Sequence, residues 1–299
     1  MARDLRNAGA SVRARLLEHA RTKGADFQIL LTRYAIERLL YRLSVSDQRD
    51  RFVLKGAMLF STWVVDPFRP TRDLDLLGNG DPDPAAVAET FRTICRTAVP
   101  DDGVIFNADR LAAAAIREHA EYGGVRVKTS ATIAGARIAI QVDIGFGDIV
   151  TPAPVVIAYP TLLDGPVPNV RAYPVETVVA EKFQALVALG VGNTRLKDFY
   201  DLWFIAQTFD FDRTTLTTAV HRTFERRRTQ LPTELPTGLG EAFAADKAAQ
   251  WIAFLTRESM AAAPQQFGTV VTDLRKFLMP LLGDGPITGE TWRAGGPWL

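Results

Sequence analysis

The spacing of apolar residues predicts several helices in the first third of the chain. Apolar positions recur every three or four residues, as on one side of a helix, in four segments: 10–22, 28–43, 57–65 and 81–98. Another side of the second helix carries Arg33, Arg38 and Arg42. We interpret these three arginines as a solvated face rather than as a grip for phosphate.

Strict alternation of apolar and polar residues predicts strands further along. Asp73 and Asp75 alternate with two leucines, so a strand would present both carboxylates on one face. The runs 125–133 and 137–144 resemble a hairpin with its turn at 134–136. In the second strand of that hairpin Asp143 lies on the polar face, opposite a face of isoleucine and valine.

Five prolines between residues 152 and 168 mark an extended crossing, and the chain beyond Pro174 has helical spacing. The sequence therefore predicts two domains, 1–165 and 166–299, the second mainly helical. The tail 283–299 resembles a loop. The fold class expected from this order of elements is α/β (α+β), a small mixed sheet with helices followed by a helical lobe.

Lys182 lies on the apolar stripe of the helix that begins near Pro174. A lysine on such a stripe either extends to solvent or neutralises a buried charge. Asp198 and Asp201, one turn apart on the next predicted helix, are the nearest acidic pair, so we expect Lys182 to meet them. One aspartate near a helix start is ordinary, because it favours the helix dipole, but two in so apolar a helix are not.

Composition excludes several kinds of site. Basic and acidic residues nearly cancel, with a formal net charge of +1, so nucleic acid would be bound only through a local patch. The single cysteine, Cys95, excludes an internal disulfide and fits a core position. The three histidines share no metal-ligand spacing, and no apolar run reaches membrane-spanning length. We expect a cytoplasmic protein that does not bind membranes.

The pair Asp73 and Asp75 suggests metal chemistry. Two carboxylates this close repel each other unless a cation lies between them, and paired Mg²⁺ or Mn²⁺ ions serve phosphoryl transfer. Asp143 has the setting of a third metal carboxylate. The simpler interpretation is that these are solvated aspartates at strand ends.

Five motifs follow one another along the chain: Lys55-Gly56, Arg69-x-Thr71-x-Asp73-x-Asp75, Asp143, Glu181-Lys182-Phe183 and Lys197-Asp198-x-x-Asp201-Leu202. In this order they resemble the AbiEii-type nucleotidyltransferase toxins, which include the MenT toxins, within the DNA polymerase β-like superfamily. The resemblance covers roughly residues 50–206.

The resemblance implies a two-lobed fold with the active site in its cleft, and transfer of a nucleotide from an NTP to RNA, in several relatives the tRNA 3′ end. It implies that Asp73 and Asp75 bind metal, with Asp143 as the third carboxylate. Lys182 would bind the triphosphate, and Asp198 would orient it or the attacking hydroxyl. An antitoxin encoded nearby is implied as partner.

The remaining nucleotide-binding candidates are Lys55, Gly56 and Thr71. Glycine lets backbone amides approach phosphate oxygens. Ala57 departs from the family pattern, which has a second glycine there, or a serine in the wider superfamily. Two alternatives stay open: a nucleotide-sugar glycosyltransferase with an Asp-x-Asp metal site, or a related scaffold that has lost activity.

A basic run that ends in Arg226, Arg227 and Arg228 is the best local patch for RNA, with Phe224 beside it. Such runs are more often solvated helix faces, so the RNA contact is a hypothesis.

Overall fold

The computed structural model describes residues 8–63, 73–116, 123–258, 260, 263–283 and 289–299. Contacts divide the chain into two compact units. Unit 1 holds residues up to 147 together with 155–172, and unit 2 holds 148–154 together with 173–299. The expected domain boundary at residue 165 falls within the stretch 155–172.

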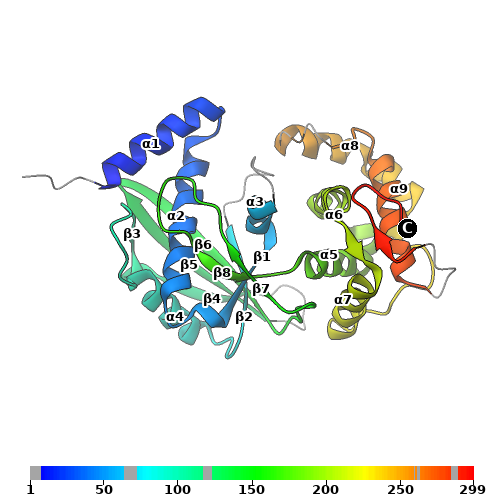
Figure 1. The fold of residues 1–299 in the computed structure, drawn as a ribbon, viewed down its shortest axis with the longest axis horizontal. Helices are drawn as coiled ribbons and strands as arrows, with labels where there is room; N and C mark the ends of the chain where they lie inside the picture. Colours follow the sequence, from blue (N-terminus) through cyan, green and yellow to red (C-terminus); the bar gives the residue numbers. More distant parts are fainter. Residues whose placement is uncertain (1–7, 64–72, 117–122, 259, 261–262, 284–288) are drawn as a thin grey trace, which may run out of the picture. The chain divides into compact units, whose positions relative to one another are not determined.

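Unit 1 is an eight-stranded mixed sheet with helices (Figure 1). Its helices are α1 (Ala8–Lys23), α2 (Phe27–Val45), α3 (Phe60–Trp63) and α4 (Pro84–Arg96). Its strands are β1 (Phe52–Lys55), β2 (Asp73–Gly78), β3 (Ile105–Phe106), β4 (Ala112–Ile116), β5 (Gly124–Ile133), β6 (Ala136–Phe146), β7 (Val155–Ala158) and β8 (Asn169–Ala172).

The strands lie in the order β3-β5-β6-β2-β1-β8-β7, and β4 pairs with β5. The β2–β6 and β1–β8 pairs are parallel, and the other pairs of this sheet are antiparallel. Helices α2 and α4 contact the strands β6 and β5, respectively. The sheet has one apolar face, where residues such as Leu74, Val127 and Val142 are buried. The opposite face carries the polar residues of β2, β5 and β6.

The predicted hairpin is confirmed, with Ile133 opposite Ala136 and the two turn residues Ala134 and Gly135 both at positive φ.

Asp83 caps α4 by accepting a hydrogen bond from the Ala86 amide, as its position before a proline at the helix start favours. Cys95 is buried in α4, and burial raises the pKa of its thiol to about 11. The predicted helix over 57–65 is a 3₁₀ turn, Gly56–Leu59, followed by α3, and its last two residues lie outside the described part.

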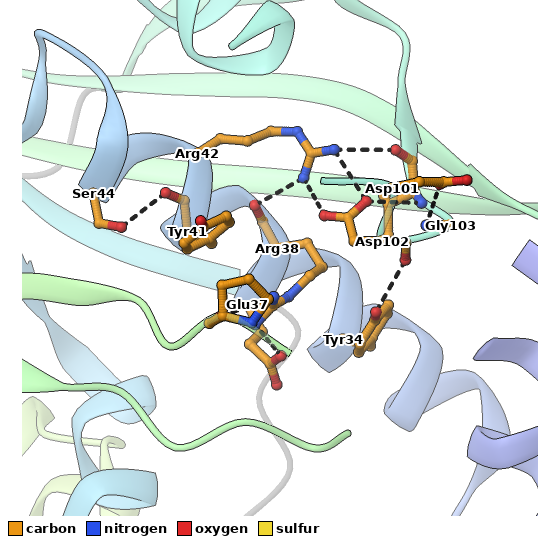
Figure 2. A network of polar contacts seen from close by, with 11 residues as sticks. Tyr34, Glu37, Arg38, Tyr41, Arg42, Ser44, Asp101, Asp102 and Gly103 are labelled. Atoms are coloured by element: carbon orange, nitrogen blue, oxygen red, sulfur yellow. Dashed lines mark hydrogen bonds and ion pairs between the residues drawn. The ribbon is translucent and has the colours of Figure 1, made fainter. Parts of the chain in front are cut away.

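The interpretation of the α2 arginines as a solvated face is wrong for Arg38 and Arg42, which are 1% and 6% exposed. Figure 2 shows their partners. Arg42 binds Asp102 through two bonds of 2.6 and 3.1 Å, and Arg38 binds Glu37 of its own helix. Burial raises the pKa of Glu37, although Arg38 opposes that shift. An arginine can be buried when a carboxylate neutralises its charge. For Arg42 that carboxylate is Asp102, which is 60 residues away in the sequence, so the spacing within the helix did not indicate it.

Unit 2 is mainly helical, as predicted. It comprises α5 (Val175–Leu189), α6 (Leu196–Thr208), α7 (Arg213–Arg226), α8 (Glu241–Glu258), α9 (Phe267–Leu278) and the short strands β9 (Phe211–Asp212) and β10 (Thr291–Trp292). Its core includes stacked aromatic rings, with Trp251 and Phe267 centroids 4.9 Å apart.

The described part of the tail is more ordered than the predicted loop, since β10 pairs with β9 and both Trp292 and Trp298 are buried. None of the helices in the described ranges combines the length and the apolar character needed to cross a membrane.

Candidate active site

The three candidate metal carboxylates lie on one face of two adjacent parallel strands. Asp75 of β2 is directly opposite Asp143 of β6, and Asp73 is directly opposite Gln141. Neighbouring strands lie about 4.8 Å apart, and residues two positions apart share a face. The β2–β6 pairing therefore brings together the Asp-x-Asp motif and the more distant aspartate that the sequence pattern singled out.

Asp143 has a cation as its immediate neighbour. Arg126 of β5, directly opposite Asp143, donates from Nε to Oδ1 and from Nη2 to Oδ2, both at 2.7 Å. Gln141 donates a weaker bond of 3.3 Å to Oδ2 of Asp143. A carboxylate has about four lone-pair sites, so these three bonds leave room for about one further ligand.

Sequence reasoning missed Arg126, although the signal was present. A two-residue turn at Ala134 and Gly135 fixes the hairpin register, and counting back from the turn places Arg126 opposite Asp143. The predicted hairpin thus already contained the pair.

Gly56 gives Asp75 its space. Lys55 of β1 is opposite Asp75, and Gly56 follows at a φ of +73°, in the region that glycine adopts without strain. A Cβ built on Gly56 would lie 2.7 Å from both Cβ and Cγ of Asp75. The backbone at Gly56 therefore lies so close to the Asp75 side chain that a larger residue than glycine would collide with it. Thr71, the other nucleotide-binding candidate of this region, lies outside the described residues.

The donor chemistry at Asp73 and Asp75 fits a hard divalent cation, since carboxylate oxygens are the ligands that Mg²⁺ and Mn²⁺ prefer. Within the described residues, however, no group of three His, Cys, Asp or Glu side chains converges as metal ligands do. Both oxygens of Asp143 accept hydrogen bonds from Arg126.

In unit 2 the lysine of the apolar stripe meets the acidic pair, as predicted. The Lys182 ammonium lies 2.6 Å from Oδ1 of Asp198 and 2.8 Å from Oδ2 of Asp201. All three side chains are largely buried, at 16%, 11% and 0% exposure. Asp201 was not among the expected catalytic residues, yet it binds the same ammonium.

The charges of this cluster stabilise one another. Burial alone would lower the pKa of Lys182, but the carboxylates of Asp198 and Asp201 outweigh it and raise that pKa. Burial likewise opposes ionisation of Asp198, and Lys182 outweighs it, so the pKa of Asp198 is lowered. An ammonium has three donors, so Lys182 retains one for a further ligand.

The basic run does not act as a unit. Arg226 and Arg228 are exposed, whereas Arg227 is held inside unit 2. Its guanidinium binds Asp148 at 3.0 and 3.1 Å, Gln184 at 3.0 Å and Glu181 at 3.2 Å. Burial opposes the charge of Arg227, but Glu181 and Asp148 raise its pKa. Arg227 therefore ties the segment 148–154 to α5, and an RNA contact stays a prediction for Arg226 and Arg228.

Two solved structures from Helicobacter pylori are similar to this chain. A crystal structure from H. pylori, described provisionally as a nucleotidyltransferase, gives a TM-score of 0.50 at 15% identity, covering 86% of this chain and 98% of that chain. The structure of JHP933 from Helicobacter pylori gives a TM-score of 0.48 at 15% identity, covering 85% and 94%. At this identity the first likeness shows a shared fold, that of a nucleotidyltransferase. Among curated proteins, none matches the sequence.

Residues 38–273 match the family described as the nucleotidyl transferase AbiEii toxin of type IV toxin–antitoxin systems. The match spans most of the chain, including β2, β6, α5 and α6. The chain belongs to this family and is a nucleotidyltransferase. The resemblance on which the sequence interpretation depended is confirmed.

Proposed function

We propose that this protein transfers a nucleotide from an NTP to an RNA acceptor, the 3′ end of tRNA, and thereby blocks translation. The observation that carries the proposal is the placement of Asp75 opposite Asp143, with Asp73 on the same face and Gly56 against Asp75. Membership of a nucleotidyltransferase toxin family supports the reaction type.

In this proposal Asp73 and Asp75 hold Mg²⁺ or Mn²⁺, and Asp143 gives its remaining lone pair to the same metal site. When bound, the metal supplies charge stabilisation for the attacking and leaving oxygens. The residues themselves position the substrates: a ribose hydroxyl attacks the α-phosphorus of the NTP and gives up its proton to water, while pyrophosphate leaves on the opposite side.

For unit 2 we propose that the third donor of Lys182 binds a phosphate oxygen of the NTP. Asp198 and Asp201 hold the ammonium in place, so its position does not depend on the substrate. Lys55 and Gly56 contact the NTP phosphates through the backbone. An antitoxin encoded nearby is the expected partner, as type IV toxin–antitoxin membership implies.

The test is a transfer assay with each α-³²P-labelled NTP in turn, total RNA as acceptor and Mg²⁺ or Mn²⁺. Label in the tRNA band that depends on the metal is the expected result. Asp73→Asn and Asp75→Asn should lose that label by at least about 100-fold, as expected for removal of electrostatic stabilisation at the reacting phosphate.

Asp47→Asn, an exposed aspartate of unit 1, serves as the matched control and should transfer normally. Transfer of a radiolabelled sugar from a nucleotide-sugar, with no label transferred from any NTP, would favour the glycosyltransferase alternative. Absence of any transfer with every NTP would refute the proposed reaction.

A further inference from the structure

A shallow hollow lies beside the carboxylates, on the same unit. It is lined by the five residues of β4, Ala112–Ile116, together with Arg126 and Lys128 of β5. Its volume is about 360 Å³, near the lower end of ligand pockets, which span roughly 300–1,000 Å³. Four of the five β4 residues are alanines, whose short side chains leave the space above the strand open.

Strand register relates this hollow to the candidate active site. One row across the sheet runs from Ala114 through Arg126, Asp143 and Asp75 to Lys55. The adjacent row runs from Ala112 through Lys128 and Gln141 to Asp73. The cations of the hollow therefore stand two strands, about 10 Å, from Asp73 and Asp75, on the same face.

Positively charged residues lie on both sides of the carboxylates in this part of the sheet. The carboxylates lie in the middle, Lys55 lies at one end, and Arg126 and Lys128 lie at the other. Arg126 is engaged with Asp143, while Lys128 is exposed and has no ion-pair partner among the described residues. Nucleotide transfer brings two phosphate-bearing substrates together, with the nucleophile and the leaving group on opposite sides of the reacting phosphorus. Cations at both ends of the carboxylate rows match that demand.

We propose that the hollow over β4 and β5 binds the terminal nucleotide of the RNA acceptor. Lys128 contacts its phosphate, the alanines of β4 leave room for its sugar and base, and Arg126 separates the hollow from the metal carboxylates while holding Asp143. This inference rests on the proposed transfer to RNA, and it assigns the acceptor to the β5 side and the NTP to the Lys55 side of the carboxylates.

The experiment measures binding of 5′-fluorescein-labelled tRNA by fluorescence anisotropy across a salt series, without NTP. Lys128→Ala should weaken binding severalfold and reduce the slope of log K against log salt by about 0.7, the value for one contact to a single strand. Lys23→Ala, an exposed lysine of α1 in the same unit, is the matched control and should keep the wild-type slope.

A second pair of variants fills the hollow without changing charge. Ala114→Leu should weaken tRNA binding and raise the KM for tRNA, while the KM for NTP stays constant. Ala139→Leu places the same side chain at an exposed position on the same face of β6, outside the hollow, and should have no effect.

The outcomes separate this inference from the proposed reaction. Because binding is measured without turnover, intact tRNA binding that depends on Lys128 supports the inference even if no nucleotide is transferred. Equal affinity and slope for Lys128→Ala and Lys23→Ala, or no binding of tRNA by the wild-type protein, would overturn it. A raised KM for NTP in Ala114→Leu would also overturn it, because the hollow would then hold the other substrate.

Discussion

Gly56 illustrates how a single residue without a side chain can define a site. Two independent features require glycine at this position: the positive φ, and the Asp75 side chain, which occupies the space that a Cβ would need. The sequence motif indicated only a backbone that could approach phosphate. The structure adds that the first atom of any side chain there would collide with a candidate metal ligand.

Gly56→Ala is expected to abolish transfer, because the new Cβ displaces the Asp75 carboxylate. Gly24→Ala is the matched control, since Gly24 also has positive φ, at +63°, but nothing lies within 4 Å of its added Cβ. Both variants should lose about 1–2 kcal/mol for the left-handed backbone, and Gly56→Ala should lose more because its Cβ meets Cβ and Cγ of Asp75. Urea unfolding measures both losses and the transfer assay measures the difference in activity; normal transfer by Gly56→Ala would show that Asp75 can move without consequence.

Single residues also mark the limit of sequence interpretation. Asp73, Asp75, Asp143 and Lys182 could be selected because each departs from the apolar pattern around it. The burial of Arg38 and Arg42 could not be selected in this way, because it depends on Glu37 and on the distant Asp102. Arg227 was likewise placed with its exposed neighbours, since nothing local in the sequence indicates Asp148 as its partner.

At the scale of elements, α5 and α6 are joined through the ion cluster of Lys182, Asp198 and Asp201. Lys182→Met would leave two buried carboxylates without a cation, which costs about 3–5 kcal/mol. Lys197→Met, an exposed lysine beside Asp198, should change stability by less than about 0.5 kcal/mol. Urea unfolding of both variants checks this, and equal stabilities would contradict a buried role for Lys182.

The same cluster gives a dependence on pH with a definite sign. The lowered pKa of Asp198 means that its contribution is present above its unfolded pKa and is lost as the pH falls through the folded value. The raised pKa of Lys182 means that its contribution is present below its unfolded pKa and lost only as the pH rises through the folded value. The stability gap between wild type and Lys182→Met should therefore narrow in acid.

A second question at this scale concerns strands β5 and β6. Asp143 either binds the metal as a ligand or only forms the ion pair with Arg126. Asp143→Asn should weaken Mn²⁺ binding because a ligand is lost, and Arg126→Met should tighten it because a nearby positive charge is removed. Isothermal titration with Mn²⁺ measures both. The double variant Asp143→Asn/Arg126→Met removes one charge of each sign, so it should bind Mn²⁺ as the wild type does if Asp143 only neutralises Arg126, and more weakly if Asp143 is a ligand.

Elements were predictable where the hydrophobic period was regular. The β5–β6 hairpin, the strand of Asp73 and Asp75, and α5 follow directly from spacing. The 3₁₀ turn at Gly56–Leu59 was predicted as a regular helix, because its apolar residues fit either form. The strand β10 was missed because it is two residues long and its stability depends on β9, which is 79 residues earlier at its nearest pairing, Thr291 with Asp212.

At the scale of the whole molecule, the question is whether the basic run of unit 2 also binds RNA, in addition to the sheet face that carries the carboxylates. Replacing Arg226 and Arg228 by alanine should weaken tRNA binding and flatten its salt dependence, with NTP binding almost unchanged. Arg227→Ala should instead destabilise the protein by about 3–5 kcal/mol, because Asp148 and Glu181 lose a buried partner. Wild-type RNA affinity of the Arg226→Ala/Arg228→Ala variant across the salt series would make these arginines a solvated helix face.

The chain passes between its two units three times, at residues 147–148, 154–155 and 172–173. During synthesis the strands β2 and β6, which carry the carboxylates, therefore leave the ribosome before β8. Strand β8 is the one that pairs with both β1 and β7. The segment 148–154 likewise leaves the ribosome long before Arg227, which binds Asp148. Neither unit is complete until synthesis has moved into sequence belonging to the other. If the gene were divided into two separately translated parts at any one of these crossings, at least one unit would consequently be split between the two products.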